Sequence, residues 1–295
     1  MPERSPQQQW LDALEGDRAH AARAASVPAD VDKERFKWSL EVLHAFLGTD
    51  WLRREIAARA PGHGYLMFGG NQDEEEYPSD QQLRLFRAHS LATDLLGAQN
   101  FRGFEQWLEH LPRRSLREAA AELRAIRHMA TAGSDVELLT PDPQAGRSPD
   151  ARFLLDNAEA WVEVKAKEDR PARAFTTNSV TNSLKTAVRQ LPDNAPGLVY
   201  LQLPYAWGDH YGALPAADMA ARSWLRHTGR VNAVVMLLER RLRIAGGGMR
   251  FSTAHYTIAH PSPRYPLPSI QGWLGGAGEG AIIQGTDGRS PDQQS

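Results

Sequence analysis

The sequence contains no cysteine among its 295 residues. Disulfide bridges, thiolate metal sites and a cysteine nucleophile are therefore excluded. The chain also lacks an uninterrupted run of about 18 apolar residues, the length that a membrane-spanning helix requires. Residues 1–20 lack the apolar segment of a secretory signal peptide. We therefore expect a cytoplasmic protein that makes no membrane contact.

The sequence likewise lacks a strong excess of charge of either sign. Its net charge is −2 and its pI is about 6.6. These values exclude a protein that is basic as a whole, so contact with a polyanion would require a local patch. The content of hydrophobic residues (41%) and charged residues (24%) is typical of globular proteins. A chain of this length forms one large domain or two modest ones.

The first third of the chain has the periodicity of helices. Apolar residues at helical spacing predict a helix over residues 34–60, and further helices are predicted over 81–96 and 101–111. A fourth helix is predicted over 115–132, where Ser115 and Glu118 form an S-x-x-E capping box and Gly133 stands at the expected C-terminal position.

After Gly133 the hydrophobic period changes to that of strands. Strands are predicted over 135–140, 151–155, 160–166, 197–203 and 231–239, with helices over 177–191 and 216–226, and a further hairpin around 246–248. This order predicts an α/β (α+β) fold in which helices flank a central mixed β-sheet. We expect a helical N-terminal region over 1–112, a second domain over 113–270 and a flexible tail over 271–295.

The predicted hairpin of strands 151–155 and 160–166 concentrates charged residues. With residues 156–159 as the turn, Arg152 falls opposite Glu163 and Asp150 opposite Lys165. Asp150, Glu163 and Lys165 then share one face of the hairpin, because side chains alternate along a strand. Two nearby carboxylates stay ionised most easily around a cation, and Mg²⁺ prefers oxygen ligands. A lysine beside them suits phosphodiester hydrolysis.

The same hairpin has a second interpretation that the residues leave open. Asp150, Arg152, Glu163 and Lys165 alternate in sign, so they are also typical of cross-strand salt bridges on a solvent-facing sheet.

The pattern Pro149-Asp150, twelve intervening residues, then Glu163-Val164-Lys165 resembles the signature of the PD-(D/E)xK nuclease superfamily. The predicted order around it, over residues 115–204, is similar to that superfamily's αβββαβ, restriction-endonuclease-like core. The resemblance implies a Mg²⁺- or Mn²⁺-dependent nuclease in which Asp150 and Glu163 are metal ligands and Lys165 is the catalytic lysine.

The resemblance also implies roles for other residues. An acidic residue of the first core helix would join the metal site, and we choose Glu122 over Glu118 because it lies on the core-facing stripe and Glu118 already belongs to the capping box. Gln190, in the helix after the hairpin, would act in catalysis. Lys185 and Arg189 would contact nucleic-acid phosphates or remain solvated charges.

Another Pro-Asp pair, at positions 141 and 142, is an alternative to the motif aspartate. Its paired position in the hairpin would fall beyond the predicted strand, which favours Asp150. The leading hypothesis is thus an endonuclease-like phosphodiester hydrolase acting on DNA. The alternative is an inactive nuclease-like module that binds nucleic acid or protein. In either case the N-terminal helical region is a candidate surface for a protein partner or a second copy of the chain.

Overall fold

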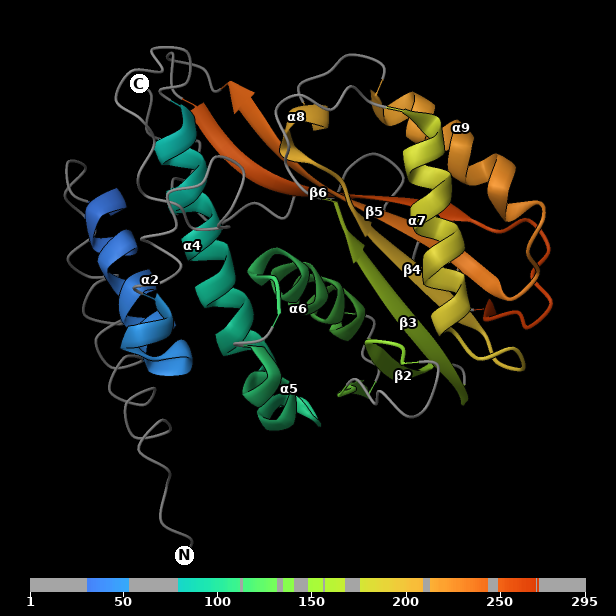
Figure 1. Ribbon diagram of the computed structural model, residues 1–295, viewed down its shortest axis with the longest axis horizontal. Helices are drawn as coiled ribbons and strands as arrows, with labels where there is room; N and C mark the ends of the chain where they lie inside the picture. Colours follow the sequence, from blue (N-terminus) through green and yellow to red (C-terminus); the bar gives the residue numbers. More distant parts are fainter. Residues whose placement is uncertain are drawn as a thin grey trace, which may run out of the picture. The chain divides into compact units, whose positions relative to one another are not determined.

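The computed structural model describes residues 31–52, 79–111, 114–131, 135–140, 148–155, 157–167, 176–208, 213–243, 249–268 and 270. Its six strands form a mixed sheet in which the strand order, β1 to β6, follows the chain (Figure 1). This confirms the predicted mixed sheet with flanking helices. In the described residues, no helix is both long enough and apolar enough to cross a bilayer.

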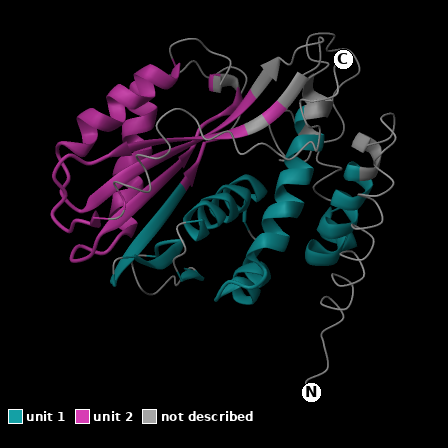
Figure 2. Ribbon diagram, turned by 180° about the vertical axis from the view of Figure 1, so that it is seen from behind, with its two compact units in different colours: residues 1–164 teal, residues 165–295 magenta. Residues whose placement is uncertain are grey.

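The chain divides into two compact units within strand β3, between Val164 and Lys165 (Figure 2). The helices of the predicted N-terminal region share the first unit with the first strands of the sheet, so this division does not coincide with the expected boundary after residue 112. The predicted tail over 271–295 lies outside the described residues.

The helices of the first unit are α2 (Val31–Leu47), α4 (Ser79–Ala98), α5 (Phe104–His110) and α6 (Leu116–Ala130). Helix α4 packs against both α2 and α6. A partly buried ion pair supports the second contact, because Arg127 Nη1 donates to the buried Asp94 Oδ1 at 2.7 Å. The positive charges of Arg127 and Arg124 offset part of the desolvation that raises the pKa of Asp94.

Two details of the predicted helices are wrong. The helix expected over 34–60 is interrupted after Leu47, because Gly48 takes a positive φ of 78°, a conformation that glycine adopts readily. Residues 49–52 are helical again, and residues 53–60 lie outside the described residues. Ser115 does occupy the N-cap of α6, but its side chain makes no capping hydrogen bond, so the capping box is not formed. Gly133 lies outside the described residues.

Strands β1 (Val136–Leu138), β2 (Ala151–Leu155) and β3 (Ala158–Ala166) pair in antiparallel fashion. Leu155 pairs directly with Ala158, and Asn157 has a φ of 59°, so the turn is two residues shorter than predicted. Arg152 consequently lies opposite Trp161 and not opposite Glu163. A shift of two residues keeps every side chain on its predicted face, because the side-chain period of a strand is two.

The second unit contains α7 (Thr177–Gln190), β4 (Gly197–Gln202), α8 (Tyr205–Gly208), α9 (Ala213–Leu225), β5 (Val231–Arg243) and β6 (Met249–Ala259). Strand β4 is buried at every position and runs parallel to β5, which pairs antiparallel with β6. Helices α7 and α9 pack side by side (Figure 1). The predicted elements are thus present, whereas the short helix α8 was not expected.

Candidate functional site

Asp150 is held at the start of β2 by three hydrogen bonds from neighbouring strands. Its backbone N–H donates to Val162 O at 2.9 Å, its carbonyl accepts from Leu139 N at 2.9 Å, and its Oδ2 accepts from Val164 N at 2.7 Å. These contacts with Val162 and Val164 lie on either side of Glu163 along β3. Extending the register by one residue from Ala151–Val162 also sets Asp150 beside Glu163. The predicted neighbourhood of the two acidic residues is therefore present in the first unit.

Arg114 links Asp150 to Glu122. Its Nη1 donates to Glu122 Oε2 at 2.7 Å, its Nη2 forms an ion pair with Glu122 Oε1, and the same Nη2 lies 3.7 Å from Asp150 Oδ1. Trp107 Nε1 also donates to Glu122 Oε2, at 2.8 Å. We call Arg114, Trp107, Glu122 and Asp150 the arginine cluster. A bidentate guanidinium–carboxylate pair of this kind is both directional and strong.

Burial dominates the electrostatics of Glu122, whose residue is only 2% exposed. Burial, together with the negative charge of Asp150, raises the pKa of Glu122 to about 8 against the opposing effects of Arg114 and Trp107. The prediction that Glu122 faces the core is confirmed, and Arg114 and Trp107 contact it there. The side-chain oxygens of Glu122 thus accept hydrogen bonds from Arg114 and Trp107, which is the environment of a structural carboxyl group.

Glu163 and Lys165 are two residues apart in β3, so they point to the same side of that strand. Glu163 is 1% exposed, whereas Lys165 is half-buried. A carboxylate is costly to bury unless a positive charge or hydrogen-bond donors compensate it. Glu163 is therefore set apart from ordinary surface glutamates by its burial.

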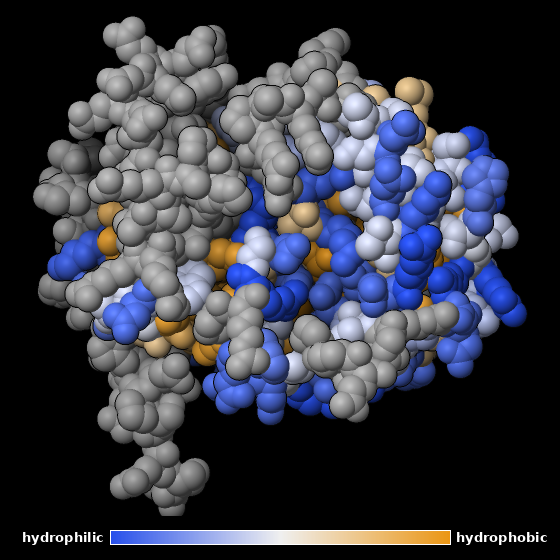
Figure 3. Space-filling model, in the orientation of Figure 1, coloured by the Kyte–Doolittle hydropathy of each residue, from blue (hydrophilic) through white to orange (hydrophobic). Residues whose placement is uncertain are grey.

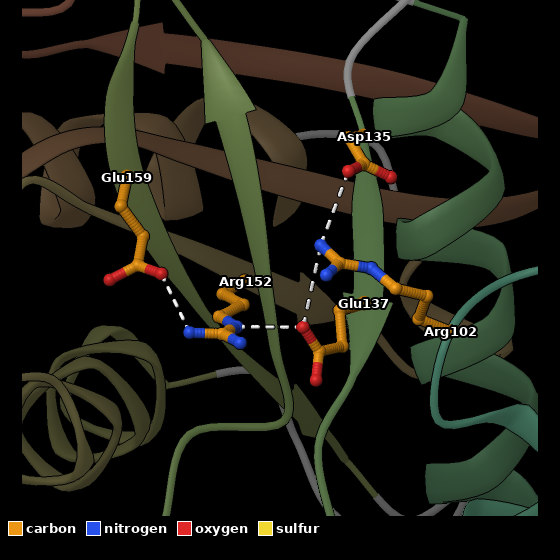
Figure 4. Close-up of polar contacts among 5 residues, drawn as sticks. All are labelled: Arg102, Asp135, Glu137, Arg152 and Glu159. Atoms are coloured by element: carbon orange, nitrogen blue, oxygen red, sulfur yellow. Dashed lines mark hydrogen bonds and ion pairs between the residues drawn. The ribbon is translucent and has the colours of Figure 1, made fainter.

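The salt-bridge interpretation of the hairpin applies to Arg152, with partners other than those predicted. Arg152 donates to Glu137 at 2.8 Å and to Glu159 at 2.7 Å (Figure 4). Arg102 extends this ladder to Glu137 and Asp135. These ion pairs are partly exposed, and such pairs contribute little to stability. The ladder accounts for the charge of Arg152, and neither Glu163 nor Lys165 belongs to it.

A cleft of about 320 Å³ lies in the second unit, beside α7. We call it the lysine cleft; it is lined by Lys165, Lys167, Ser179, Asn182, Ser183 and Thr186. Lys167 Nζ donates to the carbonyl oxygen and to Oγ of Ser179, both at 2.7 Å. These bonds fix one of the two ammonium groups against the first turn of α7.

The remaining predicted residues of α7 lie elsewhere. Gln190 does not line the lysine cleft, whereas Ser183 and Thr186 of the same helix do. Lys185 lines a second groove, between α7 and α9, and Arg189 is exposed near the C-terminal end of α7. Thr186 is the last residue of α7 in the lining of the cleft, and Gln190 lies one helical turn beyond Thr186.

Sequence reasoning missed several residues of these two clusters, namely Arg114, Trp107, Lys167, Ser179 and Asn182. Lys167 follows Lys165 by two residues, directly after the predicted strand, and Ser179 precedes Ser183 by one helical turn. Their spacing could therefore have predicted that both residues lie beside the cleft. Arg114 carried none, because nothing in its local sequence shows which acidic residues it meets in the folded chain.

In the parts of the chain that the structure describes, no group of three or more acidic or histidine side chains is arranged to hold a metal ion. The three-carboxylate set of Asp150, Glu163 and Glu122 is therefore not assembled. The alternative aspartate at position 142 lies outside the described residues. Searches against protein-family models, curated proteins and solved structures found no match to this chain.

Proposed function

We propose that this protein is a metal-dependent hydrolase of phosphodiester bonds that acts on nucleic acid, with DNA as the first substrate to test. The observation that carries the proposal is the placement of Asp150, whose hydrogen bonds to Val162 and Val164 hold it beside the buried Glu163. Two adjacent carboxyl groups, followed by Lys165 on the same side of β3, are the residue types that this chemistry needs.

The two carboxyl groups suit a hard divalent ion such as Mg²⁺ or Mn²⁺. Mg²⁺ usually takes one or two carboxylates from the protein and completes its coordination with water and substrate phosphate. A carboxylate has about four lone-pair sites, so the contact of Asp150 with Val164 N still leaves acceptor capacity. We propose Asp150 and Glu163 as the ligands. Glu122 fits this role less well, because Arg114 and Trp107 engage its oxygens.

A divalent ion held by Asp150 and Glu163 would supply Lewis-acid chemistry, polarising the phosphate and lowering the pKa of the attacking water. The protein's own part is positional and electrostatic. Asp150 is oriented by backbone hydrogen bonds and by the charge of Arg114. Lys165 positions the water and offsets the negative charge that develops on the phosphate. The catalytic role of Gln190, the last residue of α7, stays a prediction.

The test is cleavage of plasmid, linear DNA and RNA by purified protein with and without Mg²⁺ or Mn²⁺. Glu163→Ala and Lys165→Ala should each lower the rate by about three orders of magnitude or more, because charge stabilisation is the main catalytic contribution. Glu159→Ala and Lys37→Ala are matched controls, since both residues are exposed and neither is assigned to the proposed site or to nucleic-acid contact. Circular dichroism checks folding, and full activity of both site variants would exclude the mechanism.

A second candidate is a nuclease-like module that binds nucleic acid or protein without turnover, with the N-terminal helical region as a further contact surface. One observation favours it: Arg114 already supplies positive charge to Glu122 and Asp150, so these carboxylates need no metal for neutralisation. Calorimetric titration of Mg²⁺ and Mn²⁺ separates the two candidates. The hydrolase binds metal and loses that binding in Asp150→Ala, whereas the inactive module shows no binding that depends on Asp150.

A further inference from the structure

The lysine cleft has a lining of one chemical kind. Each of its six side chains carries a hydrogen-bond donor, two of them are cationic, and none is a carboxylate. Two ammonium groups without a carboxylate disfavour a metal cation, because they repel it and no anionic ligand offsets its charge. It matches a group with several negatively charged acceptor oxygens, because hydrogen bonds from a cation to an oxyanion are stronger than neutral ones.

The donors of the cleft are held in place before any ligand arrives. Lys167 is anchored by its two hydrogen bonds to Ser179, and Ser179 N in turn donates to the N-cap residue Thr176. The hydroxyl of Thr186 donates its hydrogen to Asn182 O at 3.0 Å, so that hydrogen is already engaged within α7. Fixing the donors in advance lowers the entropy that a ligand loses on binding.

Helix α7 contributes most of this lining and contains no acidic residue. Its surface is predominantly hydrophilic (Figure 3). The groove on its other side differs, since it is lined by Thr177, Thr181, Lys185, Ala220, Ser223, Trp224 and His227. That groove has one lysine where the cleft has two, and its other side chains are three hydroxyls, one imidazole, an alanine and a tryptophan. The two sides of a single helix therefore separate a donor-rich cleft from a less charged groove.

We infer that the lysine cleft binds a backbone phosphate of a nucleic-acid strand, and that it does so without a metal ion. The substrate class is taken from the proposed function, whereas the binding step is independent of catalysis. Lysine suits this role as a point charge on phosphate, and the hydroxyl and amide groups complete the contacts without reading the base sequence.

The experiment measures binding in EDTA by fluorescence anisotropy, with the full-length protein and a short, fluorescein-labelled single-stranded oligodeoxythymidylate. Asn182→Asp adds a negative charge to the cleft and should weaken binding about tenfold, because phosphate contacts dominate such affinities. Lys165→Met should reduce the slope of log affinity against log salt concentration by about one.

Thr181→Asp is the matched control. It makes the same change of charge one residue away on the same helix, but Thr181 lines the other groove. Its affinity should stay within about twofold of the wild type, since screening weakens more distant charges. Equal losses in Asn182→Asp and Thr181→Asp would show that only the general charge of α7 matters, and would overturn the assignment.

Inorganic phosphate, titrated by itself, distinguishes a free phosphate from a strand. Weak displacement of the oligonucleotide by phosphate supports the inference, whereas binding of phosphate without binding of the oligonucleotide overturns it. The cleavage assay keeps the two proposals separate. If the wild type cleaves nothing but Asn182→Asp weakens oligonucleotide binding, the phosphate-binding role of the cleft stands and the hydrolase proposal is wrong. If the wild type shows metal-dependent cleavage but Asn182→Asp binds the oligonucleotide as tightly as the wild type, the hydrolase proposal stands and the phosphate-binding role of the cleft is wrong.

Discussion

The arginine cluster of the first unit and the lysine cleft of the second satisfy their charges in different ways. In the arginine cluster, Glu122 accepts hydrogen bonds from Arg114 and Trp107, and Asp150 accepts one from Val164 N. Donors and acceptors there come from the same compact unit. The lysine cleft contains two cations and no carboxylate in its lining.

This difference separates a structural function from a binding function. A buried carboxylate with its own guanidinium stabilises the folded state only while both partners are present. An open cleft lined by donors is complemented best by an anion from outside the protein. Substitutions in the arginine cluster should therefore change stability first, whereas substitutions in the lysine cleft should change ligand affinity first.

The largest effect on stability is expected from Arg114→Met. Loss of the guanidinium leaves the buried oxygens of Glu122 without the paired donors of Arg114, which should lower the free energy of unfolding by about 3 kcal/mol. Arg152→Met is the matched control, because Arg152 pairs only in the partly exposed ladder and its loss should cost less than about 1 kcal/mol. Urea unfolding measures both values, and similar losses would remove the distinction between cluster and ladder.

A smaller loss is expected from Lys167→Met in the second unit. The substitution removes two hydrogen bonds from a charged donor to Ser179 and should cost about 2 kcal/mol. Lys185→Met, at an exposed position of the same helix, serves as the control and should leave stability unchanged. If Lys167→Met is as stable as the wild type, the inference that the hydrogen bonds from Lys167 to Ser179 anchor the cleft is wrong.

The smallest effect is a dependence of stability on pH that involves Glu122. The pKa of Glu122 is raised to about 8 in the folded protein, from an ordinary value of 4.5, so between these values the folded state holds a proton that the unfolded state releases. Stability should therefore fall as pH rises. His128 has the opposite effect below pH 6.5, since burial lowers its pKa to about 4. The useful window is thus pH 6.5 to 8.

Across that window the wild type should lose about 1.5 kcal/mol relative to Glu122→Gln, which cannot titrate at this position. Urea unfolding at several pH values gives the two profiles. Only their difference in slope matters, so a lower absolute stability of the variant does not affect the comparison. Parallel profiles would contradict the raised pKa of Glu122.

Much of the fold was predictable because local patterns specified it. The apolar stripe of α7 and the continuous apolar run of β4 place those elements within about one residue of their observed bounds. The motif around Asp150 and Glu163 was found because strand alternation is a local property. The turn was predicted less well, since Asp156 and Asn157 suit both longer and shorter turns, and only the φ of Asn157 distinguishes them.

The sequence by itself determined the order of helices and strands, the hairpin that brings Asp150 near Glu163, and the burial of Glu122. Tertiary structure decided that Arg114 links Glu122 to Asp150, that Arg152 joins a different ladder, and that Lys167 is anchored to Ser179 while Gln190 lies outside the cleft. The physical reason is range: periodicity and turn chemistry act within a few residues, whereas these contacts depend on how separate elements pack.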